Sequence, residues 1–147
     1  MTRINIIEEF QGEYRFLSNF WPSLILPPTL EHHYQAEKGA FWRTLVMDAG
    51  SPGEAKHIGA KFPVDKWDLL KPQVMLRLVR LKFEQPDLHD LLLATDNLEL
   101  QEGNRYGDSY WGRVKTVGGK WHGRNELGKV LMAVRYELRT RRGIRHP

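Results

Sequence analysis

The stretch KWDLLKPQVMLRLVRLKFEQP, residues 66–86, predicts the central helix of this protein. Val74, Leu78 and Leu81 recur on one helical face, and a second apolar stripe runs beside them. A helix that is apolar over so wide an arc is typical of a position inside the core. Pro72 is a point where the helix could restart, and the helix is expected to stop before Pro86.

Two further helices are expected on the N-terminal side of this segment. In SPGEAKHIG, residues 51–59, Ser51 can cap the helix, Pro52 occupies the first helical position, and Glu54 completes a capping box. The other helix is expected over residues 29–47. Both segments therefore add helix to the same half of the chain.

On the C-terminal side we expect a short helix after Asp87 and a final helix from about Asn125. The final helix has one apolar face, which consists of Leu127, Leu131, Val134 and Leu138. Residues 103–125 are glycine-rich and are expected to form a loop. Short strands are expected at residues 4–7, 24–28 and 98–100.

The pattern as a whole predicts an α+β fold, predominantly helical, with a few short strands. A chain of 147 residues suits one compact domain spanning residues 1–147, with a basic tail from about residue 139. The sequence has no cysteine, which excludes disulfides and thiolate metal sites and fits a reducing cytoplasm. No apolar run reaches the length of a membrane helix, so we expect a cytoplasmic protein.

The net charge is +4, and the basic excess lies in RYELRTRRGIRHP, residues 135–147, which contains five arginines. Such a tail can bind nucleic acid or phosphate. The alternative is a solvated helix end whose cations suit the negative end of the helix dipole. The first reading makes the chain a small basic nucleic-acid-binding protein.

TLEHHYQAEKGAFW, residues 29–42, is the first segment that suggests chemistry. Glu31, Gln35 and Lys38 stand at i, i+4 and i+7, so a helix places them along one face, with Tyr34 beside them. A carboxylate, an amide and an amine on one face can form the wall of a reaction site. The alternative is a solvent-exposed stripe with a glutamate in the first helical turn.

YGDSYWG, residues 106–112, places one carboxylate, Asp108, among Tyr106, Tyr110 and Trp111. Glycines let a backbone approach a ligand closely, and aromatic rings stack on planar bases. A carboxylate in an aromatic, partly dry setting suits acid–base chemistry. The alternative is an ordinary turn whose aromatic rings fold back on the core.

Two short segments supply parts for binding a nucleotide. FLSNFWPS offers Ser18 and Asn19 between aromatic residues that include Phe20, and its alternative is an Asx-type turn at a strand end. Arg124 and Asn125 precede the last helix, where free backbone amides and an arginine would form a phosphate clamp. The alternative there is that Asn125 is only a helix cap.

Several common cofactor motifs are absent from the sequence. It contains no His-Glu-x-x-His pattern, no phosphate loop ending in Gly-Lys-Ser/Thr, and no G-x-G-x-x-G after a strand. His32 and His33 are adjacent and so face different ways on a helix. We therefore expect neither a metal nor another cofactor.

Taken in order, these segments resemble the NADAR family, also called YbiA-like, of small N-glycosidases. The matching pieces are FLSNFWP, EHHYQAEK, SPGEAKHIG, KW, QVMLRLVRLKF, LLLAT, GDSYWG and GRNELGKVLMAVR, in the family's order. The resemblance implies hydrolysis of a base–ribose linkage. Two substrate classes are implied: phosphoribosylated pyrimidine intermediates early in riboflavin synthesis, and ADP-ribose attached to guanine in nucleic acid.

The resemblance also implies the residues of the site. The catalytic residues would be Glu31, Lys38 and Asp108. The substrate-binding residues would be Ser18, Asn19, Phe20, Trp67, Trp111, Arg124 and Asn125. All of them are expected to converge on one aromatic-walled cleft.

An N-glycosidase must stabilise an oxocarbenium-like centre, protonate the leaving base and activate water. Glu31 would support the ribose centre or activate water, and Asp108 would contact the ribose or the leaving base. Lys38 would either capture the ribose C1 as a Schiff base or serve as the cation that orients Glu31. The sequence leaves these two roles of Lys38 open.

The expected partner is a small nucleotide-like substrate or an ADP-ribosylated nucleic acid. We expect neither membrane attachment nor an obligate protein partner. Two alternatives to an enzyme are a non-catalytic module that binds ADP-ribose or a nucleotide, and the small basic nucleic-acid binder described above.

Overall fold

The computed structural model describes residues 5–62 and 64–145, with side chains to residue 141. It contains six α-helices, a 3-10 helix and five short strands among these residues, so the predicted α+β class with a majority of helix is confirmed. The chain divides into two compact units. Unit 1 comprises Met1–Ser18 and His89–Pro147, and unit 2 comprises Asn19–Leu88. The assignment of one domain to residues 1–147 remains a prediction.

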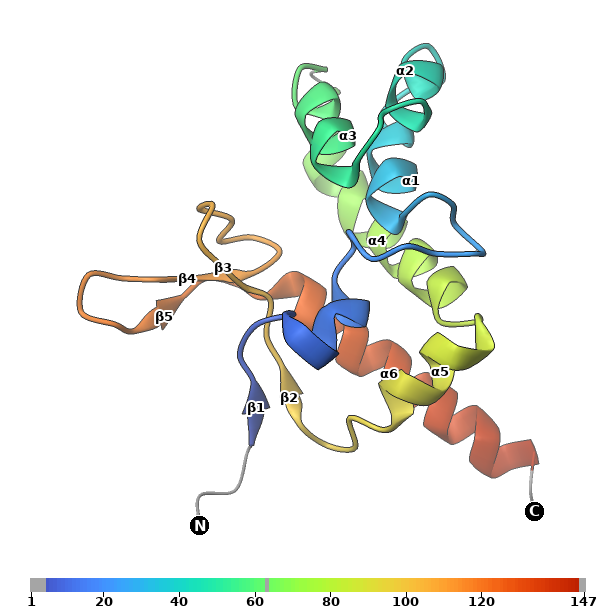
Figure 1. Ribbon diagram of the computed structural model, residues 1–147, viewed down its shortest axis with the longest axis vertical. Helices are drawn as coiled ribbons and strands as arrows, with labels where there is room; N and C mark the ends of the chain where they lie inside the picture. The colour runs from blue at the N-terminus through green and yellow to red at the C-terminus, as the bar shows by residue number, and fades with distance from the viewer. Residues whose placement is uncertain (1–4, 63, 146–147) are drawn as a thin grey trace. The chain divides into compact units, whose positions relative to one another are not determined.

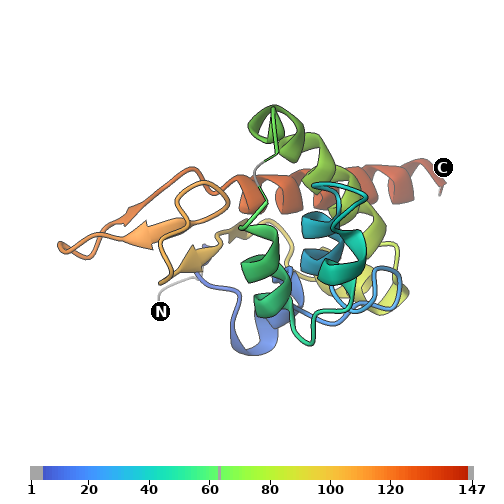
Figure 2. The ribbon, with the colours of Figure 1, turned by 90° about the horizontal axis from the view of Figure 1, so that it is seen from above.

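Unit 2 is built from four helices. They are α1 (Leu30–Ala36), α2 (Arg43–Met47), α3 (Pro52–Gly59) and α4 (Trp67–Lys82). Helix α1 packs against the other three, and Figures 1 and 2 show α1, α2 and α3 side by side. A small apolar cluster forms between them, made of Ala36, Val46, Ala49 and Ala55.

The caps of α1 and α3 follow from the sequence. The Thr29 hydroxyl accepts a hydrogen bond from the backbone N–H of His32, and the Ser51 hydroxyl accepts one from the N–H of Glu54. The Glu54 carboxylate accepts from the backbone N–H of Gly50 at 2.8 Å, one residue before the N-cap. The predicted cap of α3 is therefore confirmed, and Glu54 also fixes the chain that leads into the helix.

The helix predicted over residues 29–47 is interrupted, which corrects the sequence analysis. Helix α1 ends at Ala36 and α2 begins at Arg43. In between, the N–H groups of Lys38 and Gly39 bond to carbonyls three residues back, in tight turns. Glycine costs about 1 kcal/mol in a helix interior relative to alanine, and Gly39 stands where the helix breaks.

Two other predictions in unit 2 were wrong. The described residues 24–28 form no strand but a loop, in which Ser23 accepts the N–H of Leu26 and Gln85 accepts the N–H of Leu24. Helix α4 is continuous through Pro72, and Leu81 on its predicted core stripe is 39% exposed. The buried face of α4 consists of Met75, Leu78, Val79 and Lys82.

Unit 1 holds two small sheets and the last helix. Strand β1 (Ile6–Ile7) pairs in parallel with β2 (Glu99–Leu100), and β3 (Gly103–Asn104), β4 (Arg113–Lys115) and β5 (Trp121–His122) form the second sheet. The 3-10 helix η1 (Gly12–Leu17) follows β1, and α5 (Pro86–Leu93) precedes β2. Strands β3–β5 lie inside the segment predicted as a loop, because strands of two or three residues carry no usable periodicity.

Helix α6 (Glu126–Arg145) packs on β2, and the hairpin of β4 and β5 leads into its start (Figure 2). Its predicted core face is confirmed, because Leu127, Leu131, Val134 and Leu138 are all buried. In the part of the chain that the structure describes, no helix has both the length and the apolar character to span a membrane.

Candidate active site

Helix α1 buries two of the three polar residues predicted on one face. Glu31 and Gln35, one turn apart, are each 5% exposed. The Gln35 side-chain amide donates a hydrogen bond from Nε2 to Oε1 of Glu31 at 2.9 Å. The alternative of a solvent-exposed stripe is therefore wrong for these two residues. A buried carboxylate is costly unless it is hydrogen-bonded, and Gln35 supplies one such bond.

Lys38 follows α1 and is half-buried. Its Nζ donates a hydrogen bond to the backbone carbonyl of Gly59 at 3.0 Å, at the C-terminal end of α3. Burial lowers the pKa of Lys38 from its usual value, while the Glu31 charge raises it and the Lys71 charge lowers it further. The ammonium is thus held by the negative end of a helix dipole in a partly dry setting.

Trp67, the first residue of α4, supplies an aromatic face to the same group. Its ring centroid lies 5.8 Å from the Lys38 ammonium and 5.3 Å from the Tyr34 ring centroid. Lys38 is thus next to the Trp67 ring and within the electrostatic reach of Glu31, all in unit 2. Their roles in a site remain a prediction.

Asn19 joins this group through its backbone. Its carbonyl accepts the N–H of Glu31 at 3.1 Å, and its side-chain Nδ2 contacts Sδ of Met75 at 3.6 Å. Phe20 is partly exposed, with the Lys56 ammonium 6.0 Å from its ring centroid. Ser18 is the last residue of the first segment of unit 1, where its N–H bonds to the carbonyl of Arg15.

The Asp108 loop in unit 1 is held by backbone contacts. Oδ1 of Asp108 accepts the N–H groups of Tyr110 and Trp111 at 3.0 and 2.9 Å, which is an Asx-type turn. The Asn104 side chain binds both the N–H and the carbonyl of Asp108. Trp111 lies edge-on to Tyr110, with centroids 4.8 Å apart. The turn alternative therefore describes the local structure, and a substrate contact of Asp108 remains a prediction.

The start of α6 does not offer the free amides expected of a phosphate site. The N–H groups of residues 124, 125, 126 and 127 all donate to carbonyls of residues 109–112. This prediction was wrong because the preceding loop folds back and supplies the acceptors. The exposed guanidinium of Arg124 pairs with Glu126 at 3.0 Å and lies 4.9 Å from the centroid of the Tyr110 ring.

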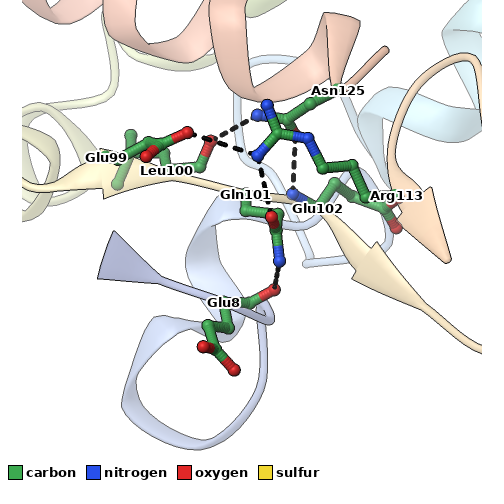
Figure 3. A network of polar contacts seen from close by, with 7 residues as sticks. All are labelled: Glu8, Glu99, Leu100, Gln101, Glu102, Arg113 and Asn125. Atoms are coloured by element: carbon green, nitrogen blue, oxygen red, sulfur yellow. Dashed lines mark hydrogen bonds and ion pairs between the residues drawn. The ribbon is translucent and has the colours of Figure 1, made fainter. Parts of the chain in front are cut away.

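Asn125 connects α6 to the sheets of unit 1 (Figure 3). It is 1% exposed, its Oδ1 accepts the N–H of Glu102, and its Nδ2 donates to the carbonyl of Leu100 at 2.9 Å. Its φ of 54° lies in the left-handed region, which asparagine tolerates better than most residues. These contacts favour the structural alternative for Asn125 over a substrate contact.

Sequence reasoning missed Glu102 and Asn104, which support the Asp108 loop. The Glu102 carboxylate accepts from Asn104 Nδ2 at 2.9 Å and from the Tyr106 hydroxyl. A Cβ on Gly112 would lie 1.9 Å from the Glu102 carboxylate, so only glycine fits there. The signal in the sequence was an asparagine four residues before the aspartate, because such side chains commonly close loops onto backbone.

Two arginines of the basic tail bind the turn before β2. Arg135 is buried and donates to the Thr95 hydroxyl at 2.8 Å, and Arg139 donates to Asn97 at 2.9 Å. Helix α6 continues to Arg145. These contacts give Arg135 and Arg139 a structural role. Among the described residues, no three His, Asp or Glu side chains form a group that could hold a metal ion.

Comparisons with known proteins extend over nearly the whole chain. Residues 8–139 match the model of the NADAR domain. The chain is 38% identical over 137 residues to the N-glycosidase YbiA of Escherichia coli (strain K12), covering 86% of this chain and 82% of that protein. It is 36% identical over 155 residues to a riboflavin biosynthesis protein of Vibrio vulnificus (strain YJ016), covering 93% of this chain. The match spans only 41% of the length of that protein.

A solved structure also resembles this chain. The NMR structure of E. coli YbiA superposes with a TM-score of 0.77 at 33% identity, covering 97% of this chain and 89% of that one. A viral relative, an N-glycosidase of Acanthamoeba polyphaga mimivirus, is 35% identical over 63% of this chain. Fold and sequence thus point to the same family.

Proposed function

Because the chain belongs to the NADAR family and is an enzyme of the N-glycosidase class, we propose that it hydrolyses the bond between a planar base and a ribose phosphate or ADP-ribose. The observation that carries this proposal is the group in unit 2. There the Lys38 amine lies beside the Trp67 ring, and the charge of the buried Glu31 carboxylate acts on that amine. A purely structural cluster has no need of an acid, an amine and a partly exposed indole together.

Hydrolysis adds water across the C1–N bond, so the hydroxyl goes to the ribose C1 and the proton to the base. Glu31 is suited to stabilise the positive charge that develops on the ribose or to deprotonate the attacking water. Asp108 would contact the ribose hydroxyls or the leaving base. Trp67 would stack on the base and exclude water from it.

Lys38 can act by two routes, and the environment of its amine bears on both. Burial lowers its pKa, which increases the neutral fraction that a Schiff base with the ribose C1 requires. The bond to the Gly59 carbonyl and the Glu31 charge favour the ammonium, which would orient Glu31. Lys38→Arg keeps the charge but cannot form the adduct, so near-normal turnover in that variant would exclude the covalent route.

The family resemblance supplies the candidates for the substrate class. We propose two candidates, the phosphoribosylated pyrimidine intermediates of riboflavin synthesis and ADP-ribosylated guanine. The first is supported by the similarity to a riboflavin biosynthesis protein, and both present a planar base on a ribose. An indole face with a nearby cation suits either base.

Incubation of the purified chain with each substrate class, with mass spectrometry of the products, tests the proposal. We expect a free base together with ribose 5-phosphate or ADP-ribose. Glu31→Gln serves as the matched variant, since it should bind substrate but not release the base. Release of base from neither class would contradict the proposal. Binding without release by the wild type would instead identify a nucleotide-binding module.

A further inference from the structure

The Gln35 side chain is an unusual part of the acid–amine group, which consists of Glu31, Lys38 and Trp67 with the residues that contact them. Its Nε2 binds Glu31, but its Oε1 is buried and has no hydrogen-bond partner among the described residues. An unsatisfied buried acceptor is destabilising, because it has lost its hydrogen bonds to water. A methionine at this position would match the length of the side chain and carry no oxygen. The N–H group, which faces the carboxylate of Glu31, therefore explains why an amide stands at residue 35.

The space that Gln35 occupies depends on Gly59. A Cβ at residue 59 would lie 2.0 Å from Oε1 of Gln35 and 2.6 Å from its Cδ, closer than real contacts allow. Gly59 ends α3 without a positive φ, so backbone conformation does not demand glycine there. The glycine is required by the Gln35 side chain packed against it.

The same glycine also holds the amine. Its carbonyl accepts the hydrogen bond from Lys38 Nζ. Gly59 is thus in contact with both residues: its lack of a side chain leaves room for Gln35, and its carbonyl accepts the hydrogen bond from Lys38. A shift of the end of α3 would disturb the acid and the amine together.

We propose that Gln35 is a positioning residue that orients the Glu31 carboxylate for the base–ribose reaction, and that Gly59 sets the placement of both Gln35 and Lys38. This inference rests on the proposed function. Gln35 acts through Glu31, because its Nε2 donates a hydrogen bond to Oε1 of the carboxylate and so fixes the direction of the carboxylate oxygens.

Two substitutions of Gln35 test this role by their kcat, their KM and the dependence of their activity on pH. Gln35→Met should lower kcat about tenfold or more with little change in KM, because a misdirected group loses rate rather than binding. Gln35→Glu places two carboxylates together, so its activity should recover towards acid pH, where the pair shares a proton and one can donate to the other.

Gly59→Ala tests whether Gly59 sets the placement of Gln35 and Lys38. It should lower kcat and the thermal unfolding temperature, because the new methyl displaces Gln35. In a Gln35→Ala background only the Cβ of residue 35 remains near the new methyl, 2.9 Å from it, so adding Gly59→Ala should cause a much smaller further loss of kcat and unfolding temperature than in the wild type. Matched controls are Gln73→Met on the exposed face of α4, and Gly53→Ala in α3, where a Cβ has room.

The outcomes separate this inference from the proposed function. A wild type that releases no base would overturn both. An active wild type with Gln35→Met at the same kcat would overturn the role of Gln35 alone. Losses from Gln35→Ala and Gly59→Ala that simply add would overturn the coupling through Gly59. Parallel falls in kcat and unfolding temperature for Gln35→Glu, without recovery in acid, would identify a merely structural residue.

Discussion

The acid–amine group of unit 2 and the Asp108 loop of unit 1 use polar side chains in different ways. In unit 2, Glu31 accepts a hydrogen bond from the Gln35 side chain, and Lys38 contacts the end of α3 and an indole ring. In unit 1, Asp108 and Asn125 bind backbone N–H and carbonyl groups. The polar residues of unit 1 therefore fix loops through backbone contacts, whereas those of unit 2 bring an acid and an amine together.

Replacing the acid of unit 2 should have the largest effect on activity. We expect Glu31→Gln to lower base release by about 10²–10⁴-fold, since it removes an acid–base or charge-stabilising group. Substrate affinity, measured by calorimetry, should stay within a few-fold of the wild type. Glu37→Gln, at an exposed ion pair just after α1, is the matched control. Unchanged release in Glu31→Gln would place the chemistry elsewhere.

Asn125→Ala, in unit 1, should lower stability rather than activity. The variant loses two buried hydrogen bonds and an asparagine that tolerates its positive φ, so we expect the free energy of unfolding to fall by about 2–4 kcal/mol. Base release per folded molecule should remain near that of the wild type. Urea unfolding would measure the free energy of unfolding, and the release assay at low temperature would measure base release per folded molecule. A large loss of release at full stability would instead make Asn125 a substrate contact.

Lys82 gives unit 2 a pH-dependent stability. It is fully buried, and burial lowers its pKa from 10.5 to about 7. Between about pH 7 and about pH 10 the unfolded chain therefore binds more protons, and the free energy of unfolding should rise with pH. The rise should be on the order of 1–3 kcal/mol, and Lys82→Met should remove most of it. Urea unfolding at pH 7 and pH 9.5 measures this.

The exposed Lys129→Met is the control for that experiment, because its ammonium is largely solvated. It should keep the slope of the wild type. Identical slopes in Lys82→Met and the wild type would show that Lys82 titrates as an ordinary lysine.

Arg124→Ala should have the smallest effect on stability. Its pair with Glu126 is exposed, and such pairs contribute about 0–1 kcal/mol. If Arg124 still meets a substrate phosphate without the help of the helix amides, KM should rise several-fold while kcat stays constant. Steady-state kinetics with a phosphorylated substrate and its dephosphorylated form would separate the two effects. Equal KM values for wild type and variant would remove Arg124 from the site.

The sequence predicted the helical face of Glu31 and Gln35 better than the start of α6 for a physical reason. Glu31 and Gln35 share a face because helical spacing is local, whereas Lys38 lies beyond the end of α1 at Ala36, a break that the periodicity did not show. The partners of the α6 amides are loop carbonyls from residues 109–112, and the partner of Asn125 is the backbone of β2. Such backbone contacts leave no pattern in side-chain spacing, so the free amides predicted there were wrong.

Hydrolysis in water enriched in oxygen-18 tests the central claim most directly, with the position of the label read by mass spectrometry soon after mixing. We predict one labelled oxygen on C1 of the released sugar and none in the base or the phosphate. A parallel sample given the heavy water only after quenching corrects for exchange at C1. Label in the base or phosphate, or an intact substrate, would contradict cleavage of the N-glycosidic bond.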